Sequence, residues 1–304
     1  MAQSLRAQYR RPAALFECRA PPPPRTSDPM LLGTRALSFC LLLPIAAGAQ
    51  ATRYARSTSD TVRLHEVTTS QLSLTTPGGA MSVETEHDAV IAMTALGGDT
   101  ISAWYDALQI AATTPTGRLA PETADVLRQP FTLRLSSHGK VTVVRTPVFP
   151  TSFQGVTDLT HQFDDFFLPL PPTPLAVGVT WRDSTARVDS GAEGGRWFRS
   201  RRVGQYRVAR DTVIDGRRAL VVAVGQESRL DVGGPLPGQP MTAVSAMAGR
   251  DSGVFVFDAS AGRMLGRRRT GELRGTLTMH PAGGSAVTFP QTLRYTHSIE
   301  PARR

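Results

Sequence analysis

Cysteine is almost absent from the chain. Among its 304 residues there are two cysteines, Cys18 and Cys40, and both lie close to the N-terminus. Residues 50–304 therefore hold no disulfide, no cysteine metal ligand and no thiol nucleophile. A body of that length can be stable through core burial alone, so the absence does not count against an exported protein.

Lysine and asparagine are equally scarce, because Lys140 is the single lysine and no asparagine occurs. Both residue types have A-rich codons, so a GC-rich bacterial genome explains the many arginines without selection for a polyanion. The formal charge of +9 is consequently weak support for a nucleic-acid partner. We expect no such partner.

Long apolar runs are missing as well. The run Ala36–Ala47 is too short to cross a bilayer, which argues against an integral membrane protein. It follows Arg35 and leads into Ala47-Gly48-Ala49, the small-x-small pattern of a secretory signal peptide. We therefore predict a signal peptide over residues 30–49, cleavage after Ala49, and a periplasmic or secreted protein.

The 29 residues that precede Met30 carry five arginines and the run Pro21–Pro24, with no apolar periodicity. We expect residues 1–29 to be a disordered arm or an extension ahead of a true start at Met30. A lipid anchor at Cys40 is disfavoured, because the bulky Phe39 stands where a small residue is needed.

Alternation of apolar and polar residues dominates the rest of the chain. Phe131–Leu135 alternates with period two, and the same period recurs in 272–279 and 293–299. Turn residues separate such runs, notably His138-Gly139-Lys140, Asp215-Gly216 and Ala261-Gly262. These patterns predict antiparallel hairpins.

One helix is expected near 158–168. Asp158 is a suitable N-cap, and Leu159, Phe163, Phe166 and Phe167 follow near helical spacing. Prolines in 169–174 prevent its continuation. A second short turn is expected at Glu122–Gln129. The Pro-rich linker 169–174 would join two halves, 50–168 and 175–304, of a single β-rich domain.

Catalytic motifs are weak. Asp189-Ser190-Gly191 and Asp251-Ser252-Gly253 resemble the aspartic-protease triplet, but the context favours turns, because Asp, Ser and Gly are common turn residues. There is no nucleophile elbow and no phosphate-binding glycine loop. We expect no enzyme activity and no cofactor.

Metal ligands are equally unpatterned. Glu84, Glu86, His87 and Asp88 cluster in the sequence, and His161 lies near Asp164 and Asp165. No H-E-x-x-H pattern or cysteine pair accompanies them. A solvated polar face explains these clusters better than a metal site.

The sequence suggests two candidate binding surfaces. Phe163, Phe166, Phe167 and Trp181 would line a pocket for an apolar ligand, although such aromatics are more often plain core. Arginines at 196–210 and 267–269 would form a stripe for an anion if their strands pair. The anion-binding candidates are Arg199, Arg201, Arg267 and Arg269.

The stretch Leu168–Pro172, followed by Val177-Gly178-Val179-Thr180-Trp181, resembles a broad group of uncharacterised exported bacterial proteins. In that group a Pro-rich linker leads to a Val-Gly-x-x-Trp start of the second half. Thr212–Gly216 and Phe257–Arg263 resemble its other recurrent hairpins. The group is similar in architecture to the periplasmic lipoprotein-carrier (LolA-like) superfamily, a bent antiparallel sheet that encloses helices. The resemblance implies an apolar ligand or an envelope role and carries no functional residue over.

Together these observations predict a mainly β (α+β) fold, with a strongly curved, half-barrel-like antiparallel sheet around one main helix. The leading functional hypothesis is a non-enzymatic exported protein that binds an apolar or amphiphilic, lipid-like ligand. The alternative is an envelope interaction module that binds anionic lipid or polysaccharide through an Arg-rich strand face. A strand-built outer-membrane protein is less favoured, because its lipid-facing strands should be more apolar. Ligand identity and oligomeric state stay open.

Overall fold

The computed structural model describes residues 52–55, 60–150, 153, 157, 159–192, 195–214, 216–236 and 239–302. The predicted signal peptide and the segment before it lie outside the described residues, as does Asp158. Within the described part, no helix is long and apolar enough to cross a membrane.

Twelve strands make up nearly all of the regular structure. They are β1 (Val62–Thr76), β2 (Gly79–Gly97), β3 (Thr100–Thr114), β4 (Gly117–Leu119), β5 (Phe131–Leu135), β6 (Val141–Arg145), β7 (Thr180–Ala192), β8 (Arg196–Ile214), β9 (Arg217–Pro235), β10 (Met241–Asp258), β11 (Arg263–Pro281) and β12 (Val287–Pro301).

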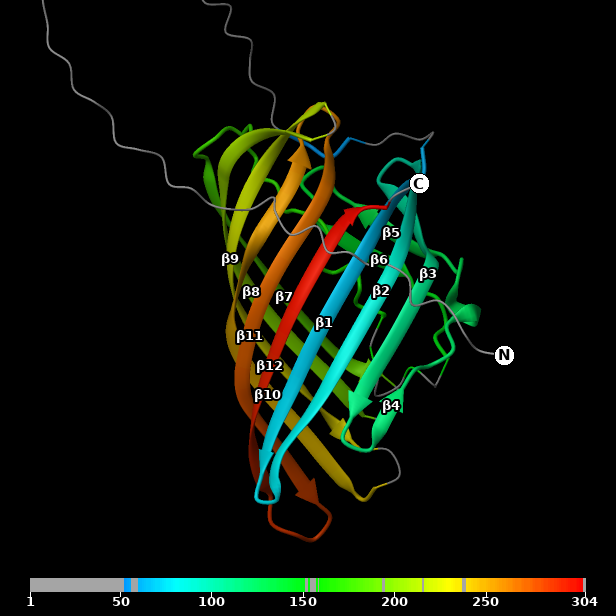
Figure 1. The fold of residues 1–304 in the computed structure, drawn as a ribbon, viewed down its shortest axis with the longest axis vertical. Coiled ribbons are helices and arrows are strands. Elements are labelled where there is room, and N and C mark those ends of the chain that lie inside the picture. Colours follow the sequence, from blue (N-terminus) through cyan, green and yellow to red (C-terminus); the bar gives the residue numbers. More distant parts are fainter. Residues whose placement is uncertain are drawn as a thin grey trace, which may run out of the picture. The chain divides into compact units, whose positions relative to one another are not determined.

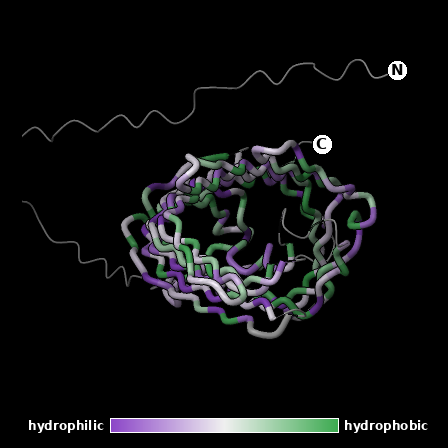
Figure 2. The backbone as a smooth tube through the Cα atoms, turned by 90° about the horizontal axis from the view of Figure 1, so that it is seen from below, coloured by the Kyte–Doolittle hydropathy of each residue, from purple (hydrophilic) through white to green (hydrophobic). Residues whose placement is uncertain are grey.

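These strands form one antiparallel sheet in the order β6-β5-β3-β2-β1-β12-β11-β10-β9-β8-β7, and β4 pairs with β3. The first and last long strands are neighbours, with Glu66 of β1 opposite Ile299 of β12 (Figure 1). The sheet curls strongly, so that it has a concave and a convex face (Figure 2). The predicted mainly β, antiparallel fold is confirmed, and strands from both predicted halves belong to the same sheet.

The predicted hairpins are present, and their strands are longer than expected. β8 and β9 meet at Gly216, and β10 and β11 meet at Gly262. Both glycines have positive φ, 73° and 58°, which other residues rarely adopt. Turn chemistry in the sequence therefore located these hairpins correctly.

The predicted main helix is wrong. Residues 160–165 form successive turns, in which Asp164 N–H bonds to His161 O and Phe166 N–H bonds to Phe163 O. A 3-10 turn is present at Ala124–Val126, inside the short turn expected at Glu122–Gln129. Arg267 of β11 donates to the carbonyl oxygens of Asp165 and Phe166, so side chains satisfy backbone groups that a helix would have used.

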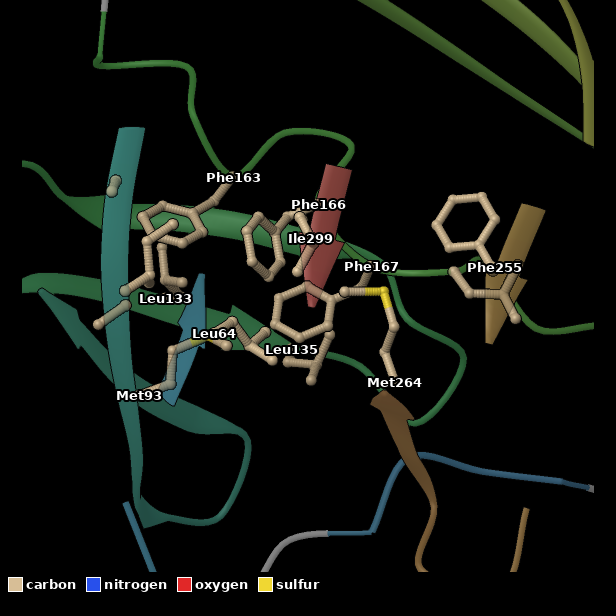
Figure 3. Packing of buried hydrophobic residues seen from close by; sticks show 14 of the residues in the cluster. Leu64, Met93, Leu133, Leu135, Phe163, Phe166, Phe167, Phe255, Met264 and Ile299 are labelled. Atoms are coloured by element: carbon tan, nitrogen blue, oxygen red, sulfur yellow. The ribbon is translucent and has the colours of Figure 1, made fainter. Parts of the chain in front are cut away.

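Segment 159–170 fills one half of the concave face, which we call the closed half. Phe163, Phe166 and Leu168 are at most 1% exposed there. They pack among Leu64, Leu133 and Ile299 from the surrounding strands (Figure 3). Edge-to-face contacts such as that of Phe131 with Phe163, whose ring centroids are 4.9 Å apart, add to the burial. This half is the hydrophobic core.

The convex face is polar. Alternation along each strand places charged and hydroxyl side chains on it, and neighbouring strands pair them across the sheet. Examples are Arg250 with Glu227, Arg294 with Glu272, and Arg268 with Glu300. The face therefore suits water, and the apolar positions of the strands lie on the concave side.

Candidate functional site

A band of buried and half-buried polar side chains, most of them charged, crosses the middle of the concave face. Most of its members lie on long strands, and Asp165 reaches them from segment 159–170. We call this set the ionic belt: Glu66, Asp165, Arg202, Asp251, Arg267, Arg269, Tyr295 and His297. Because buried charges require partners, such a belt needs a closed set of ion pairs and hydrogen bonds.

Asp165 is the centre of the belt. Its carboxylate lies 2.5 Å from Nη1 of Arg202 and 3.0 Å from Nη1 of Arg269. Burial raises the pKa of Asp165, but the charges of Arg202, Arg267 and Arg269 outweigh burial and hold that pKa well below its usual range. The segment that closes the core is thus held to strands β8 and β11 by charge.

A second buried pair lies beside it. Arg269 Nη2 and Asp251 Oδ1 are 2.7 Å apart, and the Asp251 side chain is fully buried. The Tyr295 hydroxyl donates to the other carboxylate oxygen at 2.9 Å. Gly271 lies between the two residues on β11, where a Cβ would stand 2.6 Å from Asp251 Cβ and 2.8 Å from the Tyr295 ring. Glycine there makes this contact possible.

Glu66 forms the third part of the belt. Its carboxylate accepts hydrogen bonds from Gln162 and from the His297 imidazole. Burial raises the pKa of Glu66, but the bond from His297 and nearby positive charges lower it overall. Burial and the neighbouring Arg267 lower the pKa of His297. Every ionic group of this part therefore has a partner within the protein.

A polar hollow of about 320 Å³ opens next to Glu66 on the concave face. Its walls carry the hydroxyl groups of Thr68, Ser70 and Thr85, the amide of Gln162 and the imidazole of His297. Its volume falls within the range of small-molecule sites, about 300–1,000 Å³. The hollow can therefore hold a polar group of appreciable size.

Beyond the belt and this hollow, the concave face is mostly apolar and partly exposed to solvent, although Met247 and Leu273 are buried and Gln291 bonds to Ser245 there; we call this the open half. Alternation places the following inward: Leu72, Leu74, Met81, Val83, Phe198, Leu230, Val232, Met247, Leu273, Leu277, Met279, Val287, Phe289 and Leu293. Three of them keep more than a third of their surface in water, since Met81 is 47%, Val287 46% and Val232 38% exposed. The described residues thus leave an apolar wall facing water, which is a common mark of a binding surface.

The predicted aromatic lining is divided by the structure. Phe163 and Phe166 belong to the closed core. Phe167 lines an apolar pocket of about 190 Å³ at the far end of the closed half, together with Leu64, Met93, Leu135 and Met264 (Figure 3). Its volume exceeds the roughly 150 Å³ of a dry apolar cavity that binds benzene.

Trp181 lies elsewhere. Its ring stacks on Tyr206 at 5.3 Å between centroids, and its indole N–H donates to Pro169 O at 2.9 Å. This contact joins strand β7 to the Pro-rich linker. The four aromatic residues consequently do not line one cavity.

The predicted arginine stripe does not form as one surface. β8 and β11 are not neighbours in the sheet. Arg199 and Arg201 are exposed on the convex face, and the Arg199 guanidinium stands 5.2 Å from the centre of the Trp197 ring. Arg267 and Arg269 face inward and are 6% and 5% exposed. Successive residues of a strand point to opposite faces of the sheet, so the two pairs of arginines lie on different faces.

The two Asp-Ser-Gly triplets are not turns, as the sequence suggested, but lie inside strands β10 and β7. Asp251 pairs with Arg269, and Asp189 lies near Arg187 and His161. Two strands, β8 and β9, separate the triplets in the sheet. They therefore do not form a carboxylate pair.

The candidate metal ligands are likewise separated. Glu86 pairs with Arg118, and Asp88 pairs with His65. Among the residues with described coordinates, no group of three His, Cys, Asp or Glu side chains could hold a metal ion.

Sequence reasoning named Asp165, Asp251, Arg267 and Arg269, and Arg202 within the arginine stripe, without bringing them together, and it did not single out Glu66, Tyr295 or His297. Glu66 and His297 are polar residues at inward positions of their strands, each next along that face to an apolar residue, Leu64 and Ile299 respectively. That break in the alternation is the signal that could have found them.

No family model matches the chain, and no curated protein matches it. DynF from the dynemicin biosynthesis pathway of Micromonospora chersina is 12% identical and aligns over 89% of this chain and 94% of its own, with a TM-score of 0.21. Pseudomonas aeruginosa OccK2 (OpdF) in complex with glucuronate is 8% identical and aligns over 82% and 100%, with a TM-score of 0.21. Likenesses this low carry no argument about fold or function.

Proposed function

We propose that the protein is a non-enzymatic, exported protein that binds an amphiphilic, lipid-like ligand on its concave face. The observation that carries this proposal is the apolar wall of the open half, which ends at a polar hollow and the ionic belt. An acyl chain would cover the wall, while its head group would lie at the hollow. This arrangement matches the two parts of an amphiphile and agrees with the expectation drawn from LolA-like carriers.

The energetics favour such an occupant. Apolar surface removed from water contributes about 25 cal/mol per Å². Met81, Val287 and Val232 of the open half keep more than a third of their surface in water, and a bound chain would cover them. A ligand would gain little free energy by covering the belt, because the charges of the belt are already paired inside the protein.

The test is binding of the uncharged fluorescent probe N-phenyl-1-naphthylamine to the purified protein, with native mass spectrometry for co-purifying lipid. We expect saturable binding. The double variant Met81→Ser/Val287→Ser should bind the probe at least about fivefold more weakly, because two apolar contacts are lost.

Val67→Ser is the matched control, since Val67 lies on β1 between two inward residues and faces the convex side. It should bind the probe like the native protein. Absent binding, or equal loss in the control and the double variant, would contradict the proposal.

A second candidate function is binding of an anionic lipid or polysaccharide on the convex face. Arg201 of β8 stands directly opposite Arg229 of β9, whose exposed guanidinium lies 3.2 Å from Asp231. Like charges in direct opposition destabilise a sheet, and an anionic partner would offset the part of this repulsion that Asp231 does not.

Binding of heparin at low and at physiological salt tests this second function. It predicts an affinity that falls steeply with ionic strength and that Arg201→Gln reduces. Salt-independent or absent binding would rule it out.

A further inference from the structure

The polar hollow has a defined place between the belt and the apolar wall. Along β1 the inward residues run from Glu66 through Thr68 and Ser70 to Leu72, and along β2 from His87 through Thr85 to Val83. Along β1 the inward side chains therefore change from carboxylate to hydroxyl to apolar, and along β2 they change in the same direction from imidazole to hydroxyl to apolar. An amphiphile on the wall would end at the hydroxyl level.

Three charged groups that line this hollow, Glu66, Asp165 and Arg267, already have partners within the protein. Glu66 accepts bonds from His297 and Gln162, and Arg267 donates to the carbonyl oxygens of segment 159–170. Asp165 is held by Arg202 and Arg269. A charged head group would have to displace one of these partners, and a buried ionic group left without its partner is strongly unfavourable.

Neutral hydrogen-bonding groups remain for a ligand. The Ser70 and Thr85 hydroxyls bond to one another at 2.6 Å, and one hydroxyl can both donate and accept, so each retains free capacity. Thr68 adds a third hydroxyl to the same wall. Such a surface is complementary to a ligand that itself carries several hydroxyl groups.

We propose that the hollow binds the neutral, polyhydroxylated head group of the amphiphile, of the glycerol or hexose class, in preference to a carboxylate, phosphate or ammonium head. This inference rests on the proposed function, because it assigns the head group of the same ligand. The volume of about 320 Å³ accommodates one sugar ring with bridging water.

The experiment compares amphiphiles that share a dodecyl chain and differ in the head: dodecyl glucoside, dodecanoate, dodecyl phosphate and dodecyl ammonium. Each displaces N-phenyl-1-naphthylamine from the full protein below its micellar concentration. We expect the glucoside to bind about tenfold more tightly than the charged compounds. Equal affinities, or preference for a charged head, would overturn the inference and leave the proposed function intact. No displacement by any of them, with no probe binding, would overturn both.

Two variants locate the head group. Thr68→Val and Thr85→Val each remove one hydroxyl with little change in shape, and each should weaken the glucoside about three- to tenfold, the value of one hydrogen bond. Binding of N-phenyl-1-naphthylamine, which lacks hydroxyl groups, should stay unchanged in both.

Thr69→Val is the control, because Thr69 adjoins Thr68 on β1 and bonds to Thr296 on the exposed convex side. Its glucoside affinity should equal that of the native protein. If Thr68→Val and Thr85→Val keep native glucoside affinity as well, the hollow is not the head-group site. Thermal unfolding of all three variants shows whether they fold.

Discussion

The closed and open halves of the concave face are built from the same long strands, yet they treat apolar side chains differently. In the closed half, segment 159–170 covers the strands, and Phe166 and Leu168 are fully buried. In the open half, Met81 and Val287 keep nearly half of their surface in water. The same alternation thus produces a core where a segment covers it and a partly exposed apolar wall where the described residues do not.

The ionic belt lies at the border between the two halves. Asp165, at the edge of segment 159–170, is held by arginines of β8 and β11. Past the belt, His161 of the segment still packs on Phe198 of β8, with 5.5 Å between their ring centroids. The belt therefore fixes the covering segment to the strands near the border between the halves.

The closed half should respond most strongly to truncation. Phe166→Ala leaves a cavity in a core with no exposed surface and should lower the free energy of unfolding by about 3–5 kcal/mol. Urea denaturation followed by far-UV circular dichroism measures it. A loss below about 1 kcal/mol would show that the closed half is not a packed core.

Breaking the belt should have a similar or slightly smaller effect. Arg269→Ala leaves Asp251 buried without its cation and should cost about 3–5 kcal/mol. The double variant Arg269→Met/Asp251→Leu removes both charges and should recover much of that loss. If the double variant is no more stable than Arg269→Ala, the pair is not the reason for the loss.

Acid should lower the stability of the folded protein through the histidines near the border between the halves. Burial lowers the pKa of His87 and of His297 from 6.5 in the folded chain. Below pH 6.5 the unfolded chain therefore binds more protons, so stability is full above this pH and falls as the pH decreases. Each histidine contributes a slope of at most about 1.4 kcal/mol per pH unit. Thermal unfolding between pH 7.5 and 5 should show this fall, and His297→Gln should reduce it.

The smallest effect on stability is expected in the open half. Met81→Ser replaces a half-exposed side chain and should change the free energy of unfolding by less than about 0.5 kcal/mol, as is usual for surface substitutions. The comparison with Phe166→Ala under identical urea denaturation sharpens the contrast. A loss of several kcal/mol would mean that the open half is covered in solution.

Turn residues in the sequence were sufficient to predict the hairpins. Asp215-Gly216 and Ala261-Gly262 predicted turns that the structure contains. A tight turn needs a residue with positive φ, and glycine adopts that conformation without steric strain. The period-two runs were equally reliable, since a strand that covers a core on one side must alternate.

The prediction of a helix near 158–168 was wrong because contacts from a distant strand decide the conformation of this segment. The spacing of Phe163, Phe166 and Phe167 suits a helix, but a segment this short gains little from helix formation alone. Arg267 and Arg269 of a distant strand bind its carbonyl and carboxylate oxygens instead. Nothing near the segment in sequence reveals those partners.

The sequence by itself determined that the chain forms antiparallel strands with one apolar and one polar face, because alternation and turn residues act over a few neighbouring positions. Tertiary structure alone decided that Arg267 and Arg269 face inward while Arg199 and Arg201 face outward, since β8 and β11 place these residues by their parity in the sheet. It also decided which half of the concave face segment 159–170 covers. Burial of a charge depends on which partners meet it across the sheet, and those partners come from far along the chain.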